Sequence, residues 1–235
     1  MTMTVPGLLD LLRTEPGVGA VLDAATSRQV HLLDVVAPSG ARPVVVAALA
    51  AEPPTGAGTP VLAVTATGRE TEDLAAALRC LLPPASVVEF PAWETLPHER
   101  LSPRSDTVGR RLAVLRRLAH PDPEDELAGP VRVVVAPIRA VMQPLVVGLG
   151  DLDPVRLCVG DETGLDEVAA RLVAAAYARV DMVERRGEFA VRGGILDVFP
   201  AQATEPVRVD FWGDEVEEIR GFSVASQRSE DARKQ

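Results

Sequence analysis

Residues 181–200, with the sequence DMVERRGEFAVRGGILDVFP, decide the fold of the second half of the chain. They contain two strand-like runs, Glu188–Arg192 and Ile195–Phe199, separated by a pair of glycines. Two more such runs follow, Val207–Trp212 and Val216–Phe222, and Gly, Pro or Asp again separates them. Consecutive short strands joined by turn residues pair antiparallel. We therefore predict an α+β domain with an antiparallel sheet here.

The first half of the chain shows a different pattern, in which strands alternate with helices. This alternation favours a parallel α/β sheet, and it continues to about Met142. A strand over Val155–Val159 and a helix over Gly164–Tyr177 then lead into the antiparallel region. In the first half, the expected strands are 29–36, 61–65, 86–90 and 131–136, and the expected helices are 5–12, 43–51, 69–82 and 107–119, with Ser39 capping the second helix.

Composition and charge narrow the classes of function. Hydrophobic residues make up 47 % of the chain and charged residues 25 %, which suits a packed core. The formal net charge of -10 argues against a surface built as a whole to bind phosphates. We see no signal peptide, and the longest apolar stretch, Pro43–Ala51, is too short to span a bilayer. We expect a cytoplasmic protein with no membrane association.

Motifs for catalysis are missing from the sequence. A P-loop needs several glycines and a lysine, but the segment 38–42 offers one glycine, and Lys234 is the only lysine in the chain. Cys80 and Cys158 do not form a metal-binding pair, so we expect two buried thiols and no zinc site. We predict that this chain is not an enzyme and holds no cofactor.

Three long stretches carry a resemblance to a known family. They are FPAWETLPHERLSP at 90–103, the segment 181–200 quoted above, and PVRVDFWGDEVEEIR at 206–220, which Ser226-Gln-Arg228 closes. The first resembles a segment of bacterial transcription-repair coupling factor. The other two are similar to strands that this factor shares with the repair protein UvrB. The resemblance covers nearly the whole chain.

This resemblance implies a layout and a function. Residues 1–142 would form a degenerate UvrB-like motor domain without a P-loop, and residues 143–228 an α+β domain of the kind that binds UvrA. Residues 229–235 would begin the connection to downstream domains. The chain would then be a non-catalytic docking module that recruits UvrA in transcription-coupled nucleotide excision repair. RNA polymerase and DNA would be reached only through the downstream domains of a parent ATP-dependent DNA translocase that displaces stalled polymerase.

The resemblance also suggests the residues that face UvrA. Arg179 and Arg192 match two arginines that UvrB uses, and Phe189 matches an aromatic residue in the same strand. A third UvrB arginine falls at Ala190, so that contact is lost. Because side chains alternate along a strand, Arg192 should lie on the face opposite Phe189. We predict a patch centred on Arg179 and Arg192, with Arg186 and Phe189 beside them.

A second interpretation rests on the helix expected at 107–119. Arginines cluster along one side of it, which would suit a nucleic-acid-binding domain. A solvated amphipathic face explains the same pattern. The chain has too few aromatic residues for a base-stacking platform, at 3 % of its composition. The arginines concerned are Arg104, Arg110, Arg111, Arg116 and Arg117.

Overall fold

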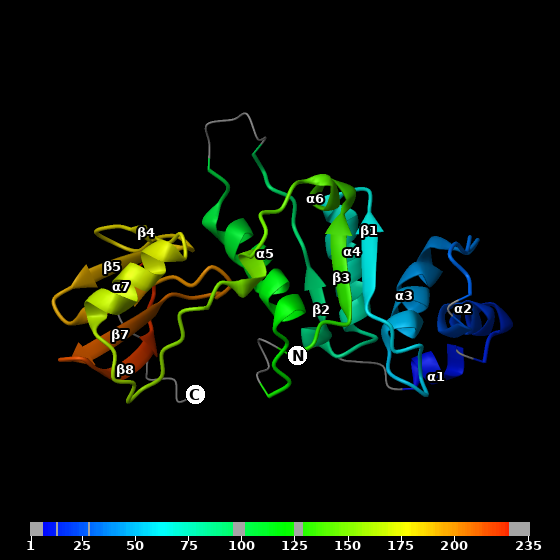
Figure 1. Ribbon diagram of the computed structural model, residues 1–235, viewed down its shortest axis with the longest axis horizontal. Helices are drawn as coiled ribbons and strands as arrows, with labels where there is room; N and C mark the ends of the chain where they lie inside the picture. Colours follow the sequence, from blue (N-terminus) through cyan, green and yellow to red (C-terminus); the bar gives the residue numbers. More distant parts are fainter. Residues whose placement is uncertain (1–6, 13, 28, 96–101, 125–128, 226–235) are drawn as a thin grey trace. The chain divides into compact units, whose positions relative to one another are not determined.

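The chain divides into two compact units that are joined by a shared helix (Figure 1). The first unit comprises residues 1–93 and 113–150, and the second comprises residues 94–112 and 151–235. Helix α5 (Ser105–Ala119) contributes its first half to the second unit and its second half to the first. The predicted boundary near Gln143 remains a prediction. The computed structural model describes residues 7–12, 14–27, 29–95, 102–124 and 129–225, so the matched segments 96–101 and 226–228 and the predicted connection at 229–235 lie outside the described residues.

A three-stranded parallel sheet forms the centre of the first unit. Its strands are β1 (Val61–Thr65), β2 (Val87–Glu89) and β3 (Val133–Pro137). Strand β3 lies in the middle, and both neighbours run parallel to it. Residues Val133 and Val135 are fully buried, which explains why this strand is an almost continuous run of valine. The predicted parallel α/β arrangement is confirmed.

Helices cover this sheet. Helix α4 (Gly68–Arg79) begins where the Thr67 hydroxyl accepts a hydrogen bond from the Glu70 amide, and it buries Leu74 and Leu78 against the strands. Helix α3 (Arg42–Ala50) contributes Ala47 and Ala50 to the same core. The remaining helical elements of this unit are α1 (Leu8–Leu12), α2 (Pro16–Ser27), α6 (Ile138–Met142) and the single turns η1 (Ser39–Ala41), η2 (Pro84–Ser86) and η3 (Leu149–Asp151).

Several predictions about local structure are wrong. The segments 29–36 and 155–159 form no described strand, because a strand requires a neighbour to pair with and none of the described strands pairs with either segment. Ser39 lies in η1 and does not cap α3. Cys80 and Cys158 are exposed, not buried. Helix α2 was not expected, since Gly17 and Gly19 weaken its sequence signal.

The second unit holds a five-stranded sheet in the order β4-β5-β6-β7-β8. Strand β4 runs parallel to β5, and the other neighbours pair antiparallel. The predicted α+β domain is confirmed, with a mixed rather than wholly antiparallel sheet. The strands are β4 (Ala178–Arg179), β5 (Glu188–Arg192), β6 (Ile195–Val198), β7 (Val207–Trp212) and β8 (Glu215–Gly221).

The two faces of this sheet differ. Helix α7 (Leu165–Ala174) lies over one face (Figure 1) and buries Val168 and Leu172 among strand residues such as Phe189 and Leu196. The opposite face carries a smaller apolar cluster of Val183, Ala190, Phe199 and Phe222, together with most of the charges discussed below. No helix in the described ranges is long and apolar enough to cross a membrane.

Candidate docking surface

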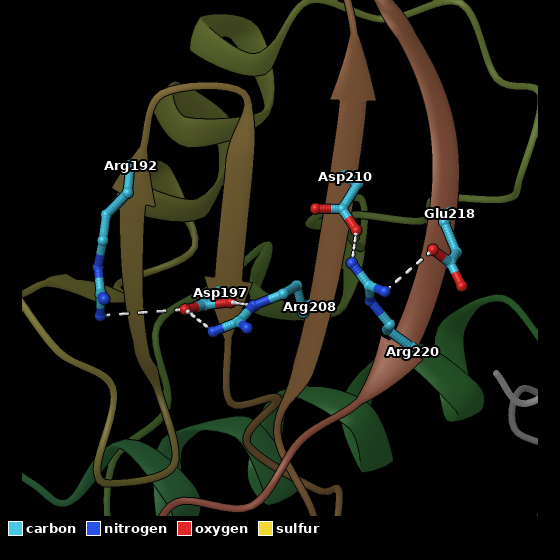
Figure 2. A network of polar contacts seen from close by, with 6 residues as sticks. All are labelled: Arg192, Asp197, Arg208, Asp210, Glu218 and Arg220. Atoms are coloured by element: carbon cyan, nitrogen blue, oxygen red, sulfur yellow. Dashed lines mark hydrogen bonds and ion pairs between the residues drawn. The ribbon is translucent and has the colours of Figure 1, made fainter. Parts of the chain in front are cut away.

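Six charged side chains lie across four strands of the second unit, on the face opposite α7. Strand pairing aligns Asp197 with Arg208, Arg208 with Arg220, and Asp210 with Glu218. Residues paired across neighbouring strands share a face, so these charges lie on one face in two neighbouring rows. We call this surface the charged face; Figure 2 shows it with Arg192, Asp197, Arg208, Asp210, Glu218 and Arg220.

The centre of the charged face is a buried ion pair. Arg208 donates from Nε and Nη2 to the two carboxylate oxygens of Asp197, at 2.6 and 2.8 Å. Asp197 is only 2 % exposed, and the guanidinium also lies 5.0 Å from the centre of the Phe222 ring. The hydrogen bonds to Asp197 raise the pKa of Arg208 above its ordinary value. Both side chains therefore belong to the folded core of the sheet and are not available to a binding partner, since a buried charge is costly without its counter-charge.

Arg192 approaches the same carboxylate from the other side but remains available. Its Nη2 atom lies 4.0 Å from Asp197 Oδ2, and its side chain is 51 % exposed (Figure 2). Asp197 is already bound by both arms of Arg208. A contact this long and this exposed contributes about 0–1 kcal/mol. Arg192 can therefore turn to an outside carboxylate without leaving Asp197 unpaired.

Arg179 does not share that face. The register places Arg179 beside Phe189, whose side chain points toward α7. The adjacent residues support the same face for Arg179. Tyr177, two residues earlier, joins the cluster under α7, whereas Val180, the next residue, joins the cluster on the opposite face. Arg179 is exposed on the edge strand β4. Arg179 and Arg192 thus flank the β4–β5 edge from opposite faces, rather than forming one flat patch.

The other predicted site residues have clear structural surroundings. Phe189 is fully buried in the core under α7, so its side chain is not on the surface, and its predicted place in the patch finds no support. Arg186 is exposed, lies 5.5 Å from the centre of the Phe199 ring and donates from Nε to the Ala203 carbonyl at 2.7 Å. Ala190 is buried and is paired with Asp197 across β5 and β6.

Helix α5 is not a solvated arginine face. Arg111 is only 1 % exposed, and burial lowers the pKa of its guanidinium to about 10. Arg117 donates to the carbonyls of Gly129 and Ala85, at 2.8 and 2.6 Å. Arg104 and Arg110 are exposed. Arg111 and Arg117 are therefore used within the protein, which weakens the nucleic-acid interpretation.

Comparison with known proteins identifies the region that carries this surface. Residues 155–235 match the family described as the UvrB interaction domain, and this range includes α7 and strands β4 to β8. Transcription-repair-coupling factor of Mycobacterium tuberculosis (strain CDC 1551 / Oshkosh) is 53 % identical over 225 residues, which is 96 % of this chain. The chain belongs to the transcription-repair-coupling factor family. It corresponds to the amino-terminal region of these factors.

More distant members of the family match a smaller part of the chain. The Bacillus subtilis (strain 168) factor is 33 % identical over 72 % of the chain, and the Escherichia coli (strain K12) factor is 34 % identical over 61 %. The chain spans 18 % of the length of the mycobacterial relatives and 14 % of the Bacillus protein. Similarity alone therefore does not show that this chain has the activities of a whole coupling factor.

Proposed function

We propose that this chain is a non-catalytic docking module that recruits UvrA in transcription-coupled nucleotide excision repair. The match of residues 155–235 to the UvrB interaction domain carries the proposal. In a parent coupling factor, ATP-driven translocation on DNA and displacement of stalled RNA polymerase would belong to other parts of the protein. The cytoplasm, where transcription and repair take place in bacteria, would be its location.

The β4–β5 edge is the part of the second unit that suits this role best. It presents Arg179, Arg186 and Arg192, all of them exposed, on a chain whose formal net charge is -10. Arginine forms bidentate pairs with carboxylates and is enriched where protein partners bind most strongly. Because Arg179 and Arg192 lie on opposite faces, a partner that contacts both must straddle the edge of the sheet. We name these three arginines the arginine edge.

Titration of purified UvrA against single alanine variants tests the proposal. If each arginine pairs with a UvrA carboxylate that becomes buried, losing it costs about 2–5 kcal/mol, or at least about thirtyfold in affinity. We expect this loss for Arg179→Ala and Arg192→Ala. Arg69→Ala, an exposed arginine at the start of α4, is the matched control and should bind as the unaltered chain does. Unchanged affinity in both edge variants would contradict the proposal.

The nucleic-acid alternative is separated by the salt dependence of binding. Phosphate-driven binding weakens steeply as salt rises, because counterions are released from the nucleic acid. We expect duplex DNA to bind this chain weakly at physiological salt, with a dissociation constant of about 10⁻⁶–10⁻⁴ M or weaker. Tight binding that Arg104→Ala and Arg110→Ala remove would favour the alternative instead.

A further inference from the structure

The opposite end of the sheet, at the β7–β8 hairpin, carries an exposed tryptophan that the proposed function does not use. Trp212 is 78 % exposed, although the chain has only two tryptophans and 3 % aromatic residues. A large exposed aromatic side chain is informative, because tryptophan is the residue type most enriched at the energetic centres of protein interfaces. Strands β4 and β8 are the two edges of the sheet, so this hairpin is separate from the arginine edge.

Trp212 follows Phe211, which is one of the residues that line a hollow on the charged face. Side chains alternate along β7, so Trp212 and Asp210 point to the same side, about 7 Å apart along the strand. The hollow has a volume of about 590 Å³, and carboxylates of Asp210, Glu217 and Glu218 line it together with Arg220. The indole of Trp212 and the carboxylate of Asp210 therefore lie on the same side of the hairpin.

The charges in and around the hollow do not cancel. Arg220 donates a hydrogen bond to Asp210 and lies 3.2 Å from Glu218, so these three charges are already linked (Figure 2). Glu217 and Glu215 are exposed, and within the described residues neither has a cation at ion-pair distance. A backbone bridge brings the exposed Glu162 beside Glu215 as well. An excess of negative charge remains, which disfavours phosphates and favours a cation.

We propose that Trp212 and Glu217 form a second docking surface, which binds a basic segment of a protein partner. An arginine of that segment would stack on the indole, where cation–π attraction is strongest, and would turn its charge toward Glu217. Its neighbours in the segment would cover the hollow. This surface and the arginine edge carry opposite charge, so they select different partners. The proposal does not depend on UvrA binding.

The emission of Trp212 offers a direct test. In a Trp93→Phe background, Trp212 is the only tryptophan, and burial of its ring shifts its emission to the blue. The probe is a synthetic peptide of alternating arginine and leucine, with its ends blocked, and the matched control is a peptide of alternating glutamate and leucine. We expect a saturable blue shift with the arginine peptide alone. A shift of equal size with the glutamate peptide, or with a short DNA duplex, would overturn the proposal.

Single substitutions then show which side chains contribute to the affinity for the peptide. With a dye-labelled arginine peptide, Trp212→Ala should weaken binding about tenfold, the size of a partly desolvated cation–π contact. Glu217→Gln should weaken it about threefold, as for an exposed ion pair. Glu72→Gln, an exposed glutamate on α4, removes the same charge elsewhere and should have no effect. Equal losses of affinity in Glu217→Gln and Glu72→Gln would show that binding depends on the total charge of the chain and not on this surface, and would overturn the proposal.

Two further measurements exclude other occupants. UvrA affinity should be unchanged in Trp212→Ala, and a loss there would assign the hairpin to the UvrA surface instead. Sedimentation should show no self-association that depends on Trp212. If Trp212→Ala abolished a dimer, a second copy of the chain would be the occupant, and the proposal of a basic partner would fail.

Discussion

The two edges of the sheet in the second unit carry opposite charge. The arginine edge at β4 and β5 exposes Arg179, Arg186 and Arg192. The hairpin of β7 and β8 exposes Glu215 and Glu217 beside Trp212. The formal net charge of -10 does not reveal this separation, since it averages over the whole chain. The comparison shows that a small domain can offer two surfaces with different preferences while its total charge suggests only one.

The Asp197–Arg208 pair lies between these edges and differs from both. Its carboxylate is buried and held at 2.6 and 2.8 Å, whereas Arg192 reaches the same carboxylate only at 4.0 Å. Thus two arginines on one carboxylate have different roles: one is part of the fold, and the other is available at the surface. The predictions below test this division, beginning with the largest effect.

Arg208→Ala should destabilise the second unit by about 3 kcal/mol. The substitution leaves the buried Asp197 with only a distant partner, and breaking a buried ion pair costs about 3–5 kcal/mol. The lower end applies because Arg192 can move toward the carboxylate. Hydrogen exchange of the β6 and β7 amides measures the change. Loss of protection in both strands should accompany weakened binding at both edges.

A double variant serves as its control. Replacing the pair together, as Asp197→Leu with Arg208→Met, removes both charges and keeps the volume filled, which is often neutral or stabilising. We expect the double variant to recover most of the lost stability. If it is as unstable as Arg208→Ala, then packing rather than the stranded charge explains the loss, and our distinction between Arg208 and Arg192 fails.

Arg179→Ala and Arg192→Ala should weaken UvrA binding independently. They lie on opposite faces of the sheet and share no partner, so their free-energy losses, each about 2 kcal/mol or more, should add within about 0.5 kcal/mol. Titration of the double variant checks this sum, with melting curves to show that the fold persists. If one of the two single variants binds UvrA with unchanged affinity, the partner contacts only one face of the edge.

The sequence predicted the strands of the second unit better than it predicted their surroundings. Turn residues marked the ends of β5 to β8, because glycine, proline and aspartate interrupt strands for local reasons. Alternation along β5 predicted the face of Arg192, but the face of Arg179 required the register of the two-residue strand β4, which has no sequence pattern of its own. The buried Asp197 also gave no signal, since its cost is offset by Arg208 on a neighbouring strand.

Thr67→Ala should destabilise helix α4 by about 1 kcal/mol, the usual value of an N-cap hydroxyl. The Thr67 side chain accepts a hydrogen bond from the Glu70 amide at the start of this helix. Hydrogen exchange of the first turn of α4 measures the effect. Since α4 belongs to the first unit, UvrA and the arginine peptide should bind the variant as before. Altered binding would show that the two edges depend on the first unit.

Arg111 is an arginine that belongs to neither edge, and its burial predicts a small effect of pH. Burial lowers the pKa of its guanidinium to about 10, below the ordinary pKa that an exposed arginine has in the unfolded chain. Between these two values the unfolded state binds more protons than the folded state. Stability from this group therefore rises with pH in that window, because ∂ΔG/∂pH is positive when the unfolded state holds more protons.

The test compares the chain with Arg111→Met, which keeps an unbranched side chain and removes the guanidinium charge. Urea unfolding, followed by circular dichroism, gives the free energy of unfolding of each protein near pH ~9 and pH ~10.5. Other groups titrate in both proteins, so the difference between them isolates Arg111. We expect the free energy of unfolding of the unaltered chain to rise, relative to that of the variant, by somewhat less than about 1 kcal/mol over this range. A difference that stays constant, or moves toward the variant, would show that Arg111 keeps its proton in the folded state, and its guanidinium would then be compensated inside the protein as fully as Arg208 is by Asp197.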